Sequence, residues 1–162
     1  MNNLVSSEVG LVHLIASILA LIFGSLILIM SKGTRRHKQV GYAYVASMLV
    51  LLFTSFMLYN LFGGFGVFHI ASIVSSVTLL LGMMPVFFKP KNWILYHLSW
   101  MYWSVIGLYA AFASEVFTRF FPAPFFSAVG IATVLIMIVG GVGFRLGLKS
   151  WKEKFSKQLK SN

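Results

Sequence analysis

The chain has 162 residues, of which 59% are hydrophobic and 10% are charged. A soluble domain has roughly 25% charged residues, so this composition excludes a soluble globular fold and indicates an integral membrane protein. The absence of cysteine excludes disulfides and thiolate zinc ligands. The net charge of +10 is confined to loops and the tail, which favours a membrane surface as the partner and excludes nucleic acid.

Five stretches approach the roughly 20 apolar residues that a membrane span needs. They run from about Glu8 to Ser31, Arg35 to Leu61, Gly66 to Phe88, Trp93 to Ala113 and Phe125 to Leu148. Thr34 and Asn92 are the expected N-caps of the second and fourth helices. The longest loop is expected between Glu115 and Phe126.

Short links between these stretches predict an all-α membrane protein with an up-down antiparallel bundle of five transmembrane helices. The first four helices would form a histidine-bearing core, with the fifth beside it. Under this layout Arg119 is the only one of thirteen Lys and Arg residues on its side of the membrane. The positive-inside rule then predicts an N-terminus outside and a C-terminus in the cytoplasm.

The tail, residues 149–162, is predicted as a region distinct from the transmembrane domain of residues 1–148. Trp151, Phe155 and Leu159 recur at four-residue intervals, with lysines on the other faces. This pattern predicts a short amphipathic helix that lies on anionic inner-leaflet lipids. A solvated tail that only stops translocation is the alternative.

One histidine lies near the start of each of the first four spans, and ionisable residues inside a bilayer mark functional sites. They are His13, His37, His69 and His97. Small and polar residues three and four positions away share a helix face with each histidine, so the rings are expected to point into the bundle. Alternate helices of a square bundle have axes roughly 12–14 Å apart, a gap that suits a heme iron with one imidazole on each side.

We therefore predict that His13 and His69 hold an outer heme b, and His37 and His97 an inner one. Six further residues are candidates to contact the cofactor. Arg35, Arg36, Lys89 and Lys91 would pair with the heme propionates. Gly41 would leave room for the macrocycle, and Trp100 would line it. Any chain with a histidine early in each of four antiparallel helices places those histidines alternately on the two sides of the membrane. Protonation, another metal and plain packing therefore stay open as roles for these side chains.

The predicted arrangement over about residues 8–113 resembles the four-helix core of cytochrome b561-type di-heme proteins, in architecture and not in motif. That resemblance implies electron transfer within or across the bilayer, as an oxidoreductase subunit whose partner is a quinone or a redox protein.

A second resemblance rests on sequence over about residues 12–48. The segments Val12-His13-Leu14-Ile15-Ala16 and Lys32-Gly33-Thr34, with His37 and Gly41, resemble the uncharacterised bacterial membrane family called domain of unknown function 2306. The family pattern reads roughly HxxxGxxxLxxG and then KGxxxHRxxG, and here Ser17 replaces a glycine and Lys38 an arginine. This resemblance implies a bacterial cytoplasmic membrane and brings no reaction.

The alternative from a different class is a non-redox membrane protein, such as a small transporter, a channel or an assembly partner. In that case the histidines have proton or packing roles. Gly140, Gly141, Gly143 and Gly147 include the GxxxG spacing, which favours close helix contact and a homodimer.

Overall fold

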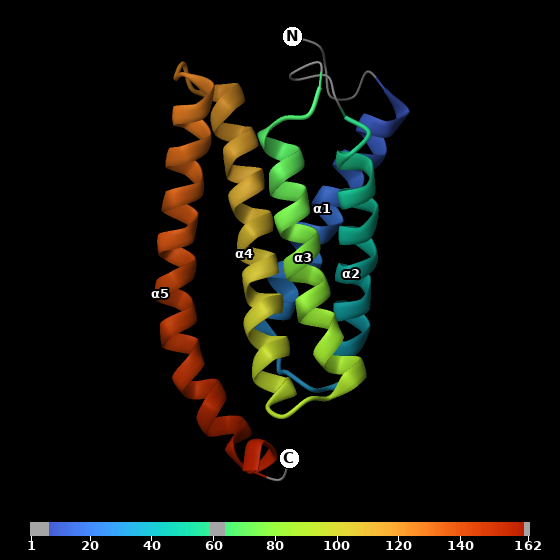
Figure 1. Ribbon diagram of the computed structural model, residues 1–162, viewed down its shortest axis with the longest axis vertical. Helices are drawn as coiled ribbons and strands as arrows, with labels where there is room; N and C mark the ends of the chain where they lie inside the picture. The colour runs from blue at the N-terminus through green and yellow to red at the C-terminus, as the bar shows by residue number, and fades with distance from the viewer. Residues whose placement is uncertain (1–6, 59–63, 161–162) are drawn as a thin grey trace. The chain divides into compact units, whose positions relative to one another are not determined.

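The computed structural model describes residues 7–58 and 64–160, without the side chains of residue 154 and residues 156–160. The regular structure of the described residues is entirely helical (Figure 1): α1 (Glu8–Ile29), α2 (Arg35–Ser55), α3 (Val67–Phe88), α4 (Trp93–Phe120) and α5 (Phe125–Lys160). The predictions made for Leu61 and for the Leu159 side chain lie outside this description.

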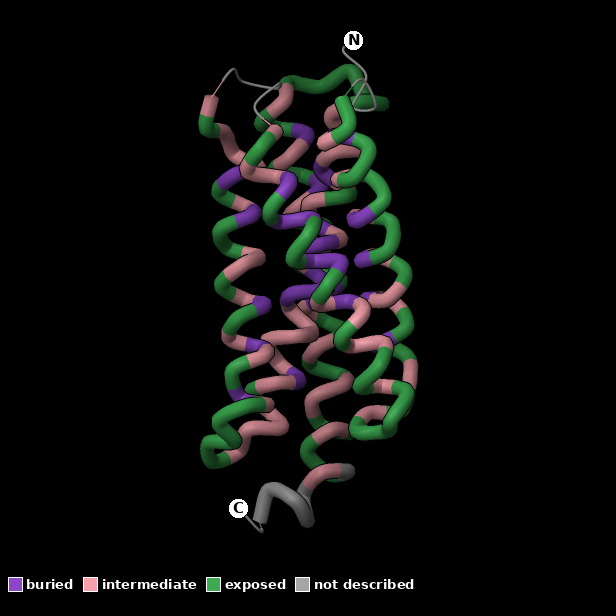
Figure 2. Tube along the Cα trace, turned by 90° about the vertical axis from the view of Figure 1, so that its right-hand side faces the viewer, coloured by how far each residue is buried: buried purple, intermediate pink, exposed green. Residues whose placement is uncertain are grey.

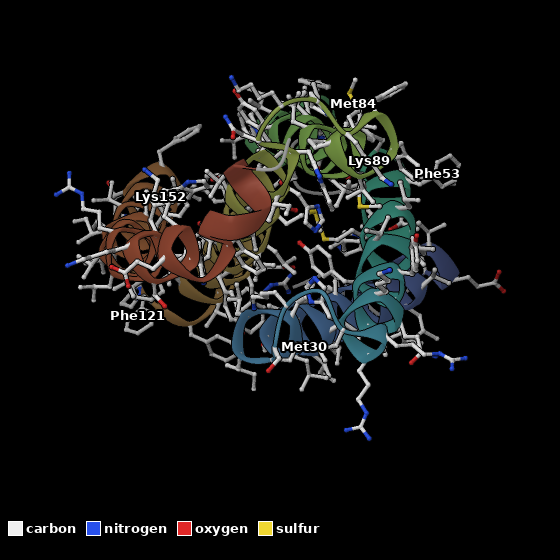
Figure 3. The ribbon with its side chains drawn as sticks, turned by 90° about the horizontal axis from the view of Figure 1, so that it is seen from below. Met30, Phe53, Met84, Lys89, Phe121 and Lys152 are labelled. Atoms are coloured by element: carbon white, nitrogen blue, oxygen red, sulfur yellow. The ribbon has the colours of Figure 1, made fainter. Side chains whose placement is uncertain are left out.

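Three helices among the described residues are long and apolar enough to cross a membrane: α1, α3 and the Phe125–Glu153 part of α5. The expectation of a membrane protein is confirmed at this level, while the count of five spans and the bundle remain predictions. Many large apolar side chains are exposed, as lipid-facing residues are. Figure 2 shows exposed positions, in green, along the helices. Phe53 of α2, for example, is 72% exposed and projects away from its helix (Figure 3).

The chain divides into two compact units, Met1–Ser76 and Val77–Asn162, and each is described by itself. In the first unit α1 packs along α2. Ala20 of α1 and Tyr44 of α2 are fully buried, and Gly24 is buried one turn after Ala20. Small residues let helix backbones approach closely in lipid, so the predicted small-residue face of the first helix is confirmed.

In the second unit α4 packs along α5. The Tyr102 hydroxyl donates a hydrogen bond to the Gly140 carbonyl over 2.8 Å. A Cβ atom at Gly140 would lie 2.6 Å from Cγ2 of Ile106, so only glycine allows this approach. The close contact predicted from the glycine spacing is thus made within the chain, and the homodimer remains a prediction.

The predicted end of the fourth helix at Ala113 is wrong, because α4 continues to Phe120. Arg119 donates to the Glu115 carboxylate one turn earlier over 2.8 Å, and such a pair supports a helix by a few tenths of a kcal/mol. The long loop predicted here therefore shrinks to the link of residues 121–124, which contains two prolines.

The helix starts agree better with prediction than the helix ends. Thr34 is confirmed as the N-cap of α2, because its side chain accepts a hydrogen bond from the His37 backbone amide over 3.1 Å. Asn92 precedes α4 but makes no side-chain cap, since its backbone is left-handed with φ of 62°. The Trp93 amide instead donates to the Pro90 carbonyl.

Two further ends differ from the sequence predictions. α2 ends at Ser55, six residues before the predicted end. α5 continues through the tail to Lys160, so residues 149–160 belong to the same helix rather than to a separate one. The sequence contains neither glycine nor proline between Leu148 and Lys160, and lysine and glutamate are good helix formers.

The glycine contacts predict a difference between two neighbouring substitutions. Gly140→Ala should lower the free energy of unfolding by about 1–3 kcal/mol, because the new methyl overlaps the stiff, β-branched Ile106. The control is Gly141→Ala, where a Cβ meets nothing within 4 Å, and a small stabilisation is expected from helix propensity. Denaturant unfolding of both variants in mild detergent measures the difference, and equal stabilities would contradict the packing described.

Candidate functional site

His13 forms a hydrogen bond between α1 and α2. Its Nδ1 lies 3.0 Å from the Thr54 hydroxyl oxygen. The single Thr54 hydroxyl proton is directed at backbone carbonyls of its own helix, those of Val50 at 2.8 Å and Leu51 at 3.0 Å. Carbonyls only accept, so when the Thr54 proton serves either of them, His13 Nδ1 is the donor and the Thr54 oxygen is the acceptor. In the neutral ring, the lone pair is then on Nε2.

His97 makes the corresponding bond between α4 and α3 in the second unit. Its Nδ1 lies 2.7 Å from the Gly82 carbonyl oxygen, which can only accept. His97 therefore also donates from Nδ1 and has its lone pair on Nε2. A Cβ at Gly82 would lie 2.6 Å from the Met101 sulfur, so a glycine lets α4 come this close to α3.

His69 has the opposite arrangement. The Gly66 backbone amide donates to its Nδ1 over 3.1 Å, so the neutral ring has its proton on Nε2. His69 is the third residue of α3 and bonds back to the residue before the helix, as the glutamate of a capping box does. It is 5% exposed and stacks on Phe65 with ring centroids 5.0 Å apart. His69 therefore stabilises the start of its own helix.

His37 lies in the first turn of α2, where its backbone amide is bound by Thr34. Its side chain is half-buried, whereas those of Arg35, Arg36 and Lys38 are exposed. The sequence left open a fully solvated His37, and the partial burial distinguishes this ring from its cationic neighbours.

The remaining predicted site residues are distributed over the two units. Lys89 and Lys91 are exposed in the turn before α4, and Trp100 is half-buried on α4. Gly41 lies four residues after His37, on the same helix face, and a Cβ there would meet nothing within 4 Å.

The described residues contain no group of three or more histidine, aspartate or glutamate side chains able to hold a metal ion. Of the four histidines, His13 and His97, each in its own unit, have the Nδ1 contact with an oxygen that leaves the lone pair of a neutral ring on Nε2.

Sequence reasoning missed both of the oxygen partners, Thr54 and Gly82. A signal for them existed in the symmetry of the helical hairpins. His13 lies 20 residues before Gly33, and Thr54 lies 20 residues after Thr34. In an antiparallel hairpin, residues equidistant from the turn meet, so the register itself indicates Thr54 as a neighbour.

A comparison with family models matched residues 10–146 to the family described as predicted membrane protein (DUF2306). The match covers most of the chain, and the chain belongs to this family. No match was found among curated proteins or among solved structures.

The capping role of His69 predicts how two substitutions of similar size behave. His69→Gln retains an acceptor that can reach the Gly66 amide, whereas His69→Met leaves that amide without this acceptor. The methionine variant should lose about 0.5–2 kcal/mol of stability, as N-terminal cap removals do, and the glutamine variant should lose less. Unfolding in mild detergent measures both, and equal losses would contradict the capping role.

Proposed function

We propose that this chain is a membrane-embedded b-type cytochrome that transfers electrons within or across the bilayer. The observation that supports the proposal is the hydrogen bonding of His13 and His97. Each ring donates its Nδ1 proton to a protein oxygen, of Thr54 and of Gly82 respectively. Metal-ligating histidines typically make this bond, because it fixes the ring and leaves a basic Nε2 lone pair.

The residues fit a heme b unequally. His13 and His97 present the ligating tautomer, and His37 has open space at Gly41 one turn away. Arg35, Arg36, Lys89 and Lys91 would pair with propionates, and Trp100 would line the macrocycle. His69 fits least, because ligation through Nε2 requires loss of the hydrogen bond from Gly66. Heme supplies reversible one-electron transfer when bound.

The oxygen partners of the two histidines do the positioning in this proposal. Thr54 and Gly82 each hold an imidazole against rotation about its side-chain bonds, and each raises the basicity of the opposite ring nitrogen. The lipid-facing helices exclude water around the rings, which disfavours the charged imidazolium. Exclusion of water thus favours the neutral ring, which is the form that ligates a metal, while the hydrogen bond makes its Nε2 a stronger donor to the metal.

The proposal places the protein in the cytoplasmic membrane of a bacterium, with the N-terminus outside and the C-terminus in the cytoplasm. The distribution of Lys and Arg supports this orientation, since Arg119, in the last turn of α4, would alone lie on the side opposite to the other twelve. The partner would be a quinone or a redox protein that exchanges single electrons. A non-redox membrane protein is the alternative, and the structural role of His69 is the observation that favours it.

The first experiment is a visible spectrum of the full chain, purified in mild detergent from heme-sufficient cells. We expect a sharp b-type α-band in the reduced-minus-oxidised spectrum. His13→Ala and His97→Ala should each remove heme measured by pyridine hemochrome, while the control variant Ser55→Ala retains it. Absence of Soret absorbance in the wild-type protein, even after addition of hemin, would overturn the proposal.

A second test changes a positioning residue instead of a ligand. Thr54→Val removes the acceptor of the His13 Nδ1 proton and should weaken heme retention about 10–100-fold, as loss of such a partner does in metal sites. The control is Ser55→Ala, because the Ser55 hydroxyl bonds only to the Leu52 carbonyl of its own helix in the contacts described. Equal heme affinity of the two variants, measured by hemin titration, would argue against His13 as a ligand.

A further inference from the structure

One side of α5 changes from apolar to basic at a single point along the helix. Ile131 and Ile138 are exposed, at 54% and 59%, and lie seven residues apart on one face. The next positions on that face at the same interval are Arg145 and Lys152, which are also exposed. Lys149 lies between them, four residues after Arg145. We call Arg145, Lys149 and Lys152 the basic stripe.

The opposite side of α5 contacts α4, which fixes the rotation of the helix about its axis. Phe144 and Trp151 lie with their ring centroids 5.4 Å and 5.8 Å from that of Tyr102. Gly140 and Gly147 belong to the same side, one turn before each of these rings. The basic stripe therefore faces away from α4, in continuation of the lipid-exposed surface.

This packing differs from the sequence prediction for the tail. Trp151 was expected to enter the lipid surface as part of a separate amphipathic helix. It contacts Tyr102 and Phe144 of the same unit instead, and the tail is continuous with α5. Trp151 thus serves internal packing, and Lys149 and Lys152 beside it are exposed.

The length of the apolar segment agrees with the position of the stripe. Phe125 begins α5 and Arg145 follows 20 residues later, which corresponds to about 30 Å of helix. This length equals the thickness of a bilayer hydrocarbon core. With Phe125 at one boundary, Arg145 lies at the other, where its long side chain reaches the headgroups.

We propose that the basic stripe binds the phosphate groups of anionic phospholipids at this membrane surface. The molecule that binds the basic stripe must lie next to the hydrocarbon of the bilayer, because the stripe directly continues a lipid-exposed apolar face. It must also be anionic, since three cations share the stripe and the sequence of α5 contains one acidic residue, Glu153. A phospholipid with a net negative headgroup meets both requirements.

The test uses the full chain in an uncharged detergent, with thermal unfolding as the readout. Phosphatidylglycerol should raise the Tm of the wild-type protein, whereas phosphatidylcholine and inorganic phosphate at equal concentration should not. The triple variant Arg145→Gln, Lys149→Gln, Lys152→Gln should bind phosphatidylglycerol at least roughly tenfold more weakly. The charge-keeping variant Arg145→Lys, Lys149→Arg, Lys152→Arg and the distant Arg119→Gln are matched controls and should retain the effect.

Three results would overturn the proposal. Undiminished binding by the triple glutamine variant would exclude the stripe. An equal Tm increase with phosphatidylcholine would show that headgroup charge is irrelevant, and an equal increase with phosphate would identify a free anion as the ligand. If the triple variant does not fold, the wild-type protein still decides, because the phosphatidylglycerol effect must weaken as salt rises.

Discussion

A polar side chain in a bilayer has no water to bind, so it must find its hydrogen-bond partner within the protein. The described histidine contacts follow from this constraint. His13 donates to a hydroxyl of the neighbouring helix, His97 donates to a backbone carbonyl of the preceding helix, and His69 accepts from the backbone at the start of its own helix. These bonds link α1 to α2, α4 to α3, and α3 to the residue that precedes it.

Such bonds need helices that approach closely, and the small residues provide that approach. Gly82 illustrates the link, because a Cβ there would overlap Met101 and would hold α4 away from α3. With α4 at that distance, His97 reaches the Gly82 carbonyl over 2.7 Å. Packing thus determines the hydrogen bond, and the hydrogen bond determines which ring nitrogen has the lone pair.

The sequence predicted helix starts well, because caps and turns have local signals such as Thr34. It predicted the end of α3 at Phe88 correctly but missed the ends of α4 and α5, because hydropathy marks where lipid contact stops and not where the helix stops. Both α4 and α5 continue beyond their predicted ends, through segments that contain glutamate and arginine or lysine, which are good helix formers. The contact between His97 and Gly82 could also have been predicted from the sequence. Gly82 lies seven residues before Lys89 and His97 seven after Pro90, so the two are equidistant from the turn.

The roles of the individual histidines required the structure, yet their depth in the helix explains them. His69 is the third residue of α3, close enough to accept the amide of the residue before the helix. His13 is the sixth residue of α1 and His97 the fifth of α4, so both lie beyond the reach of such an amide. Their rings turn to oxygens of a neighbouring helix, which only accept from them. The depth of a histidine in its helix thus determines whether Nδ1 accepts from the helix start or donates to a neighbouring helix.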